Sequence, residues 1–156
     1  MSQISATSLT QSSIHNALLH FETLLIGAIL VASGFALSGL STVHYAGLAD
    51  FATVQGIIPA FIAGLLIASG FVLAFSQQYL GFALMKTIQE YSSVVVAGIL
   101  YMVGQFLIGF GNTTAPTQPL AGTILIIAGY VLVAVSIVLT GNTGLSISKL
   151  SPPTVK

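Results

Sequence analysis

Long uninterrupted runs of apolar residues alternate with short polar stretches along the whole chain. The four longest apolar runs cover residues 21–40, 57–75, 94–110 and 120–140. They show no alternation at every second residue and exceed the length of ordinary strands, so they predict helices although β-branched residues are frequent in the last two. At about 1.5 Å per residue, roughly 20 residues cross the ~30 Å hydrocarbon core of a bilayer. We therefore predict an all-α fold, with about four long apolar helices forming hairpins or a bundle and no sheet.

Glycine and proline mark the expected ends of these helices. Pro59 is tolerated because it falls in the first turn of the second run. Gly-Asn pairs at 111–112 and 141–142 predict helix ends, and the prolines in 111–119 predict a loop before the fourth helix. Residues 76–90 mix polar and apolar positions, which fits either a continuation of the second helix or a solvated elbow.

The two ends of the chain are polar but almost uncharged. Residues 1–16 are rich in Ser, Thr and Gln and have no basic start, so we interpret them as an N-terminal arm and not as a secretory signal. Residues 17–142 form the expected hydrophobic domain, and residues 143–156 an extended polar tail.

Composition places this chain outside the class of soluble monomers. Charged residues make up 4% of it and hydrophobic residues 55%, with a mean hydropathy of +1.03; a typical soluble domain has roughly 25% charged residues. A soluble monomer of this kind would expose large apolar patches and aggregate. Lipid or apolar partners must therefore cover the surface. The formal net charge is zero, which argues against sequence-specific nucleic-acid binding through a basic face.

Small residues recur at intervals of four within the first two apolar runs. Such spacing forms a groove in which another helix backbone can approach closely. We therefore expect helix packing, within the chain or between copies, at Ala28, Ala32, Ala36, Gly64, Ala68, Gly70 and Ala74. Residues 29–37 (ILVASGFAL) also nearly match residues 65–73 (LLIASGFVL) at an offset of 36. Either a helix was duplicated, or helices drawn from few residue types resemble one another by chance.

The ionisable residues form no recognisable site. Glu22 borders the first apolar run and is either a proton or cation site or a carboxylate that complements the dipole of a first helical turn, which is the interpretation we favour. His15 and His20 are five residues apart, which is unsuited to metal binding on one helix face, and His44 has no partner for haem. Asp50 lies in the first connection. We expect neither a metal nor a cofactor.

Three further polar features have modest expected roles. Lys86 and Glu90 suit a weak surface ion pair, and Gln105 suits a hydrogen bond between helices because it lies deep in an apolar run. Asn112 begins a three-residue glycosylation pattern that often arises by chance. The sequence lacks cysteine, and no nucleophile–base or paired-carboxylate arrangement predicts catalysis. We therefore expect a protein that is not an enzyme.

Two expected marks of a polytopic membrane protein are weak. The sequence has no Arg to set topology and no Trp for an interfacial belt. A coat subunit needs neither, because its helices pack against identical neighbours. The paired apolar runs at 21–40 and 57–75, and at 94–110 and 120–140, between uncharged polar arms resemble the small hydrophobic helical coat proteins of archaeal viruses, particularly spindle-shaped ones.

That resemblance is compositional, and it implies a structural role in a virion, where copies of the chain assemble with one another and lipid is a possible further partner. The first alternative is an integral membrane accessory subunit of a larger, respiratory-type complex. A small transporter using Glu22 or Asp50 ranks third, because the recognisable motifs of small multidrug transporters are not matched here.

Overall fold

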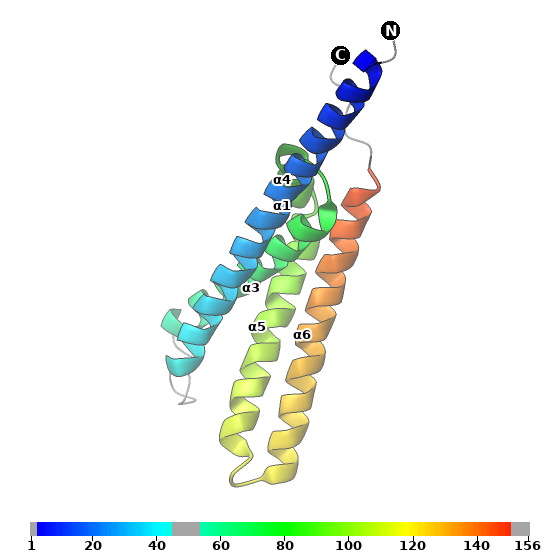
Figure 1. Ribbon diagram of the computed structural model, residues 1–156. Helices are drawn as coiled ribbons and strands as arrows, with labels where there is room; N and C mark the ends of the chain where they lie inside the picture. Colours follow the sequence, from blue (N-terminus) through cyan, green and yellow to red (C-terminus); the bar gives the residue numbers. More distant parts are fainter. Residues whose placement is uncertain (1–2, 45–53, 151–156) are drawn as a thin grey trace.

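A computed structural model describes residues 3–44 and 54–150, and most of these residues are helical. Five helices follow in order and no strand occurs in these two ranges, which confirms the all-α prediction (Figure 1). The helices are α1 (Gln3–His44), α3 (Val54–Ser76), α4 (Leu80–Gln89), α5 (Tyr91–Thr114) and α6 (Pro119–Ser148).

The long helices form two antiparallel hairpins, α1 with α3 and α5 with α6, and α3 joins the hairpins by packing against both α5 and α6 (Figure 1). This arrangement gives the molecule two ends. We call the end that carries α4, the last turn of α3 and the last turn of α6 the α4 end. The opposite end carries the connection between α5 and α6 and is called the loop end.

Four helices are long and apolar enough to cross a membrane: His20–Leu40, Ile57–Ser76, Tyr91–Thr114 and Pro119–Ser148. Their length and composition indicate a membrane location. They coincide with the four predicted apolar runs. A helix satisfies its own backbone hydrogen-bonding groups, so each of these segments can lie in lipid without water along its length.

The predicted end of the last helix was wrong. The Gly141-Asn142 pair does not end α6, which continues to Ser148, so residues 143–148 are helical and not extended. Gly144 and Ile147 explain the difference. Ile147 is buried, and a methyl group placed on Gly144 would stand 2.7 Å from the backbone oxygen of Val72. Tertiary packing against α3 thus overrides the local stop signal. Likewise α5 continues past Gly111-Asn112 to Thr114.

The start of the first helix also differs from the prediction. α1 begins at Gln3, whereas the predicted apolar helix began at residue 21. Residues 3–16 contain neither glycine nor proline, so nothing in them breaks a helix. Glu22 therefore lies far from the first turn, and its predicted role as a partner of the helix dipole was wrong, because that effect fades within one turn.

The α4 end is held together by a sharp elbow after α3. Gln77 has a positive φ of 50°, a conformation that a residue other than glycine adopts at some cost. The next residue, Gln78, connects three helices. Its carbonyl oxygen accepts a hydrogen bond of 2.6 Å from Thr23 Oγ1, and its Nε2 donates to the backbone oxygens of Ser148 and Leu150 at 3.0 and 3.1 Å. The elbow thereby ties α1 and α6 to the end of α3.

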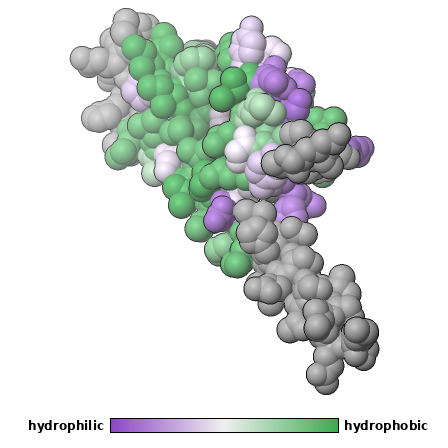
Figure 2. Space-filling model, turned by 90° about the horizontal axis from the view of Figure 1, so that it is seen from above, coloured by the Kyte–Doolittle hydropathy of each residue, from purple (hydrophilic) through white to green (hydrophobic). Residues whose placement is uncertain are grey.

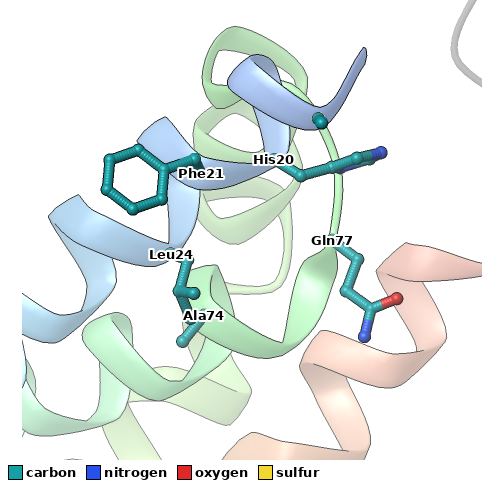
Figure 3. A pocket seen from close by; sticks show the side chains of 6 residues that line it. His20, Phe21, Leu24, Ala74 and Gln77 are labelled. Carbon is teal, nitrogen blue, oxygen red and sulfur yellow. The ribbon is translucent and has the colours of Figure 1, made fainter. Parts of the chain in front are cut away.

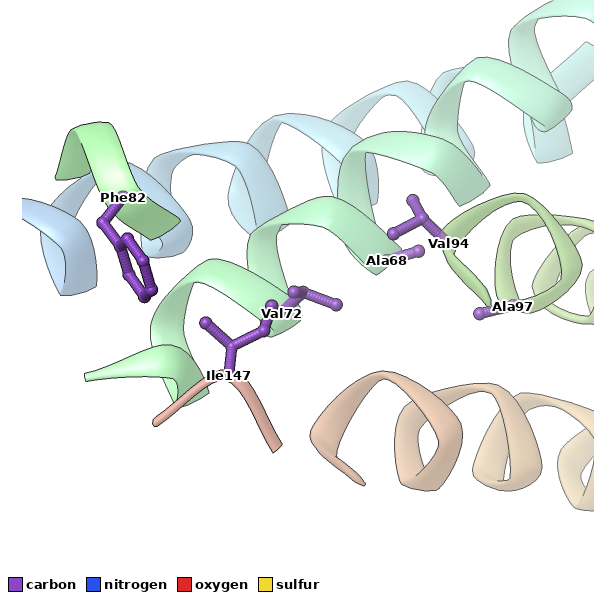
Figure 4. Packing of buried hydrophobic residues seen from close by; sticks show 6 residues of the cluster. All are labelled: Ala68, Val72, Phe82, Val94, Ala97 and Ile147. Atoms are coloured by element: carbon purple, nitrogen blue, oxygen red, sulfur yellow. The ribbon is translucent and has the colours of Figure 1, made fainter. Parts of the chain in front are cut away.

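A small apolar core lies next to this elbow, where α3 meets the other hairpin (Figure 4). It combines small and large apolar side chains from four helices: Ala68, Val72, Phe82, Val94, Ala97 and Ile147. Helix α4 supplies only Phe82, which covers the end of the cluster. The residues 76–90 therefore form an elbow with its own short helix and do not continue α3.

Candidate helix-packing surface

The contact between α1 and α3 is made by glycines at two levels. A methyl group placed on Gly27 would stand 2.7 Å from the carbonyl oxygen of Gly70, and one on Gly70 would stand 2.6 Å from the carbonyl oxygen of Gly27. Seven residues further along α1, Gly34 faces Ala63 in the same way, at 2.9 Å. The two backbones therefore touch directly, and any added side chain at these positions would overlap the partner helix.

The contact between α5 and α6 repeats this geometry. A methyl group on Gly104 would stand 2.8 Å from the carbonyl oxygen of Gly129, and the reverse distance is 2.6 Å. Seven residues along α5, Gly111 faces Gly122 at 2.8 Å. In each hairpin the second glycine of each helix also receives a β-branched side chain from the partner. These side chains are Val31 on Gly70, Ile67 on Gly34, Ile108 on Gly129 and Ile126 on Gly111.

All four long helices therefore carry one motif: two small residues seven apart, with a β-branched residue three positions before the second. The motif covers residues 27–34, 63–70, 104–111 and 122–129. The similar segments of the first two helices are offset by 36 residues, so Gly27 corresponds to Ala63 and Gly34 corresponds to Gly70. The contact of Gly27 with Gly70 therefore corresponds to the contact of Ala63 with Gly34.

A further glycine contact joins the two hairpins. A methyl group on Gly64 of α3 would overlap the carbonyl oxygen of Gly98 on α5. Ala68, one turn further along α3, is buried in the core beside this contact. The second hairpin thus covers the face of α3 that carries Gly64 and Ala68.

The structure separates the predicted packing residues into two groups. Gly64, Ala68 and Gly70 are buried and Ala74 is half-buried, all at contacts of α3. Ala28, Ala32 and Ala36 are exposed, because α1 turns Gly27 and Gly34 to α3 instead. They make no close helix contact within the described chain, and a contact between copies stays a prediction.

The sequence pattern of small residues four apart does not include the glycines that make most of these contacts. Those glycines are seven residues apart in the sequence, as Gly27 and Gly34 are. Two turns of an α-helix take about seven residues, so either spacing keeps small residues on one face.

Among the described residues, no buried side-chain nitrogen or oxygen atom lacks a hydrogen-bond partner. Tyr101 of α5 and Ser38 of α1 are joined by a hydrogen bond of 3.4 Å, and Ser136 Oγ donates to the backbone oxygen of Ala97 at 2.8 Å. Gln105 was predicted to link two helices. It hydrogen-bonds Tyr101 of its own helix, and Tyr101 makes the link to α1.

The ionisable candidates do not converge. Glu22 is exposed, and the described residues contain no group of three or more metal-ligating side chains. The predicted pair of Lys86 and Glu90 was wrong: Lys86 Nζ donates to Gln89 Oε1 at 2.8 Å and lies 5.8 Å from the centre of the Phe82 ring. Asp50 and the side chains of His15 and His44 lie outside what the structure describes.

The outer surface is apolar along the spans and polar at one end. Large apolar side chains are exposed on every long helix, among them Leu25, Ile29, Ile62, Val96, Ile124 and Val138. Of the charged residues that the structure describes, all four lie at the α4 end: Glu22, Lys86, Glu90 and Lys149. In Figure 2, which looks down on this end, hydrophilic residues gather in one area and apolar residues occupy the rest.

Comparisons with known proteins add no name to this arrangement: no family model, no curated protein and no solved structure matches the chain. The packing geometry is therefore the main guide to function.

The glycine contacts predict a matched mutational pattern. Gly70→Ala and Gly129→Ala each force a methyl group against a backbone oxygen and should lower the free energy of unfolding by about 1–3 kcal/mol. Gly109→Ala is the control on α5, since nothing lies within 4 Å of its added methyl group; it should be neutral or slightly stabilising. Reversible unfolding in mixed micelles, followed by circular dichroism, measures all three. Equal stability of all three variants would contradict the contact assignment.

Proposed function

We propose that this chain is a non-catalytic structural subunit, embedded in lipid, that assembles with copies of itself. The finer form of the proposal is a coat or envelope subunit of a virion, as the resemblance to archaeal viral coat proteins implies. In this role the inner glycine contacts build a thin, rigid unit. Its exposed apolar faces then bind lipid and neighbouring units.

One observation carries the proposal: the helices meet through glycines, and many of their large apolar side chains are exposed on every long helix. Exposed fractions reach 58% at Ile124 and 61% at Val138 on α6. A continuous apolar exterior of this kind marks an interaction or membrane surface. Ala28, Ala32 and Ala36, exposed on α1 between larger apolar neighbours, supply the face on which a second copy could approach most closely.

The alternative is an accessory subunit of a cellular membrane complex, and the placement of the lysines fits it as well. Lys86 and Lys149 lie at the same end of the molecule, whereas the described part of the loop end has no charge. Lysines near span ends face the cytoplasm in cellular membranes. This bias fits a chain inserted by a cell, whether it stays there or is later taken into a virion envelope.

Both forms predict the same orientation, and the cysteine-free sequence allows a clean test. Gln89→Cys places a thiol at the exposed α4 end, and Thr117→Cys places one at the exposed loop end. In intact cells, a membrane-impermeant maleimide should label Thr117→Cys from outside and reach Gln89→Cys only after the membrane is opened. Labelling of both variants in sealed cells would contradict a spanning bundle, and the reverse order would contradict the lysine argument.

Self-assembly through α1 makes a separate prediction. Ala32→Leu adds bulk to an exposed face and should leave the isolated bundle intact, but overpack a contact between copies by about 1–3 kcal/mol, weakening association roughly 5- to 150-fold. Ala134→Leu is the matched control, an exposed alanine on α6. Energy transfer between labelled copies in vesicles, measured against protein-to-lipid ratio, reports association. If Ala32→Leu associates like the parent and the control, α1 is not the contact.

A further inference from the structure

A cavity of about 480 Å³ lies at the α4 end, between α1 and the end of α3 (Figure 3). Its lining residues are Ala17, His20, Phe21, Leu24, Ala74 and Gln77. The volume falls in the range of roughly 300–1,000 Å³ that is usual for small-molecule sites. None of the contacts described for helix packing uses the space itself.

The cavity is polar at one side and apolar at the other. The polar side lies at the ends of the membrane spans and the apolar side lies further into them, as in the headgroup and hydrocarbon layers of a bilayer. His20 is the first residue of the first membrane span, and Gln77 directly follows Ser76, the last residue of the second span. Leu24 and Ala74 lie one turn or nearly one turn further into their spans. Figure 3 shows the side chains of His20 and Gln77 directed to the same side, with Leu24 and Ala74 between the two helices. The polar groups are thus at headgroup depth and the apolar ones at the start of the hydrocarbon.

Both polar groups are available as hydrogen-bond donors. Neither the His20 ring nor the Gln77 side chain has a partner among the residues that the structure describes, whereas the adjacent Gln78 uses its side chain to hold the end of α6. The positive φ of Gln77 sets its direction at the elbow. An imidazole donates through one nitrogen in either neutral tautomer, and a primary amide donates through two hydrogens.

The ligand must then be an acceptor with an apolar body. None of the described lining residues carries a carboxylate. Glu22, two residues after His20, is displaced by about 200° around α1 because each helical residue turns about 100°. A phosphodiester accepts hydrogen bonds without donating any, which matches an imidazole and an amide. A free phosphate would leave the Leu24 and Ala74 side of the cavity unfilled.

We propose that this cavity binds one glycerophospholipid, with its phosphodiester at His20 and Gln77 and the first part of an acyl chain against Leu24 and Ala74. The proposal rests on the membrane location within the proposed function and is independent of self-assembly. The lipid fills the space between α1 and α3 where their glycine contacts end, and so completes the surface of the first hairpin.

Native mass spectrometry of the detergent-solubilised full chain tests the site. The probes are dimyristoyl phosphatidylglycerol, dimyristoyl glycerol, which lacks the phosphodiester, and inorganic phosphate. The parent should retain one phosphatidylglycerol about tenfold more strongly than the diacylglycerol, and phosphate should not displace it. The double variant His20→Ala/Gln77→Ala should lose this preference, and Ala17→Trp, which fills the cavity from α1, should lose retention of both lipids.

Two control variants make the result specific. Gln118→Ala removes an exposed amide at the loop end, and Ala134→Trp adds the same bulk to an exposed position on α6, outside the cavity; both should bind like the parent. Equal retention of the two lipids by the parent, displacement by phosphate, or unchanged retention in the His20/Gln77 and Ala17 variants would overturn the proposal. Flotation of the parent chain with vesicles in a density gradient separates the two claims. If the chain floats but gives one of these contradicting results, only the lipid site is refuted; if it does not float, the membrane location itself is refuted.

Discussion

Direct contact between helix backbones at glycine is the constraint on which the rest of this structure depends. At Gly27 on Gly70, and again at Gly104 on Gly129, there is no room for even a methyl group. Because the closest contacts accept only small residues, many of the larger apolar side chains of the long helices point outward, which makes the exterior apolar. In lipid this arrangement costs little, since lipid tails are as apolar as the side chains and helices associate by van der Waals packing. In water the same exterior would aggregate.

The same constraint explains how few polar groups the bundle needs and where they lie. Inside the spans, hydroxyl groups donate to nearby carbonyls or to one another, as Ser136 does across to Ala97, and thus add links between helices without charge. Among the described residues, charge is confined to the α4 end, where Gln78 ties three helices together and Lys86 lies beside Phe82. The described part of the loop end, around residues 110–120, has no charged side chain. In the described residues, the α4 end therefore carries the charged side chains and the hydrogen bonds of Gln78, and the loop end carries no charge.

The sequence predicted the number, type and approximate position of the long helices, because a run of about 20 apolar residues has few other stable solutions. It did not predict helix ends that depend on tertiary contacts, such as the extension of α6 through Gly144 and Ile147. It identified Gly64 and Gly70 as contacts but missed the glycines of α1 that face α3, since alanines spaced by four and glycines spaced by seven lie on different sides of that helix. The cavity at His20 and Gln77 could not be foreseen, because it depends on a left-handed residue at the elbow.

The central claim is that this exterior lies in lipid, apart from faces that neighbouring copies cover. Spin labels placed one at a time on α6 from Val131 to Val138, in vesicles, test it most directly through their accessibility to oxygen and to a water-soluble nickel complex. The account predicts high oxygen and low nickel accessibility at the exposed positions Val131, Val135 and Val138, and low accessibility to both at the buried Ser136. Strong nickel accessibility at the exposed positions would place this face in water and contradict the account.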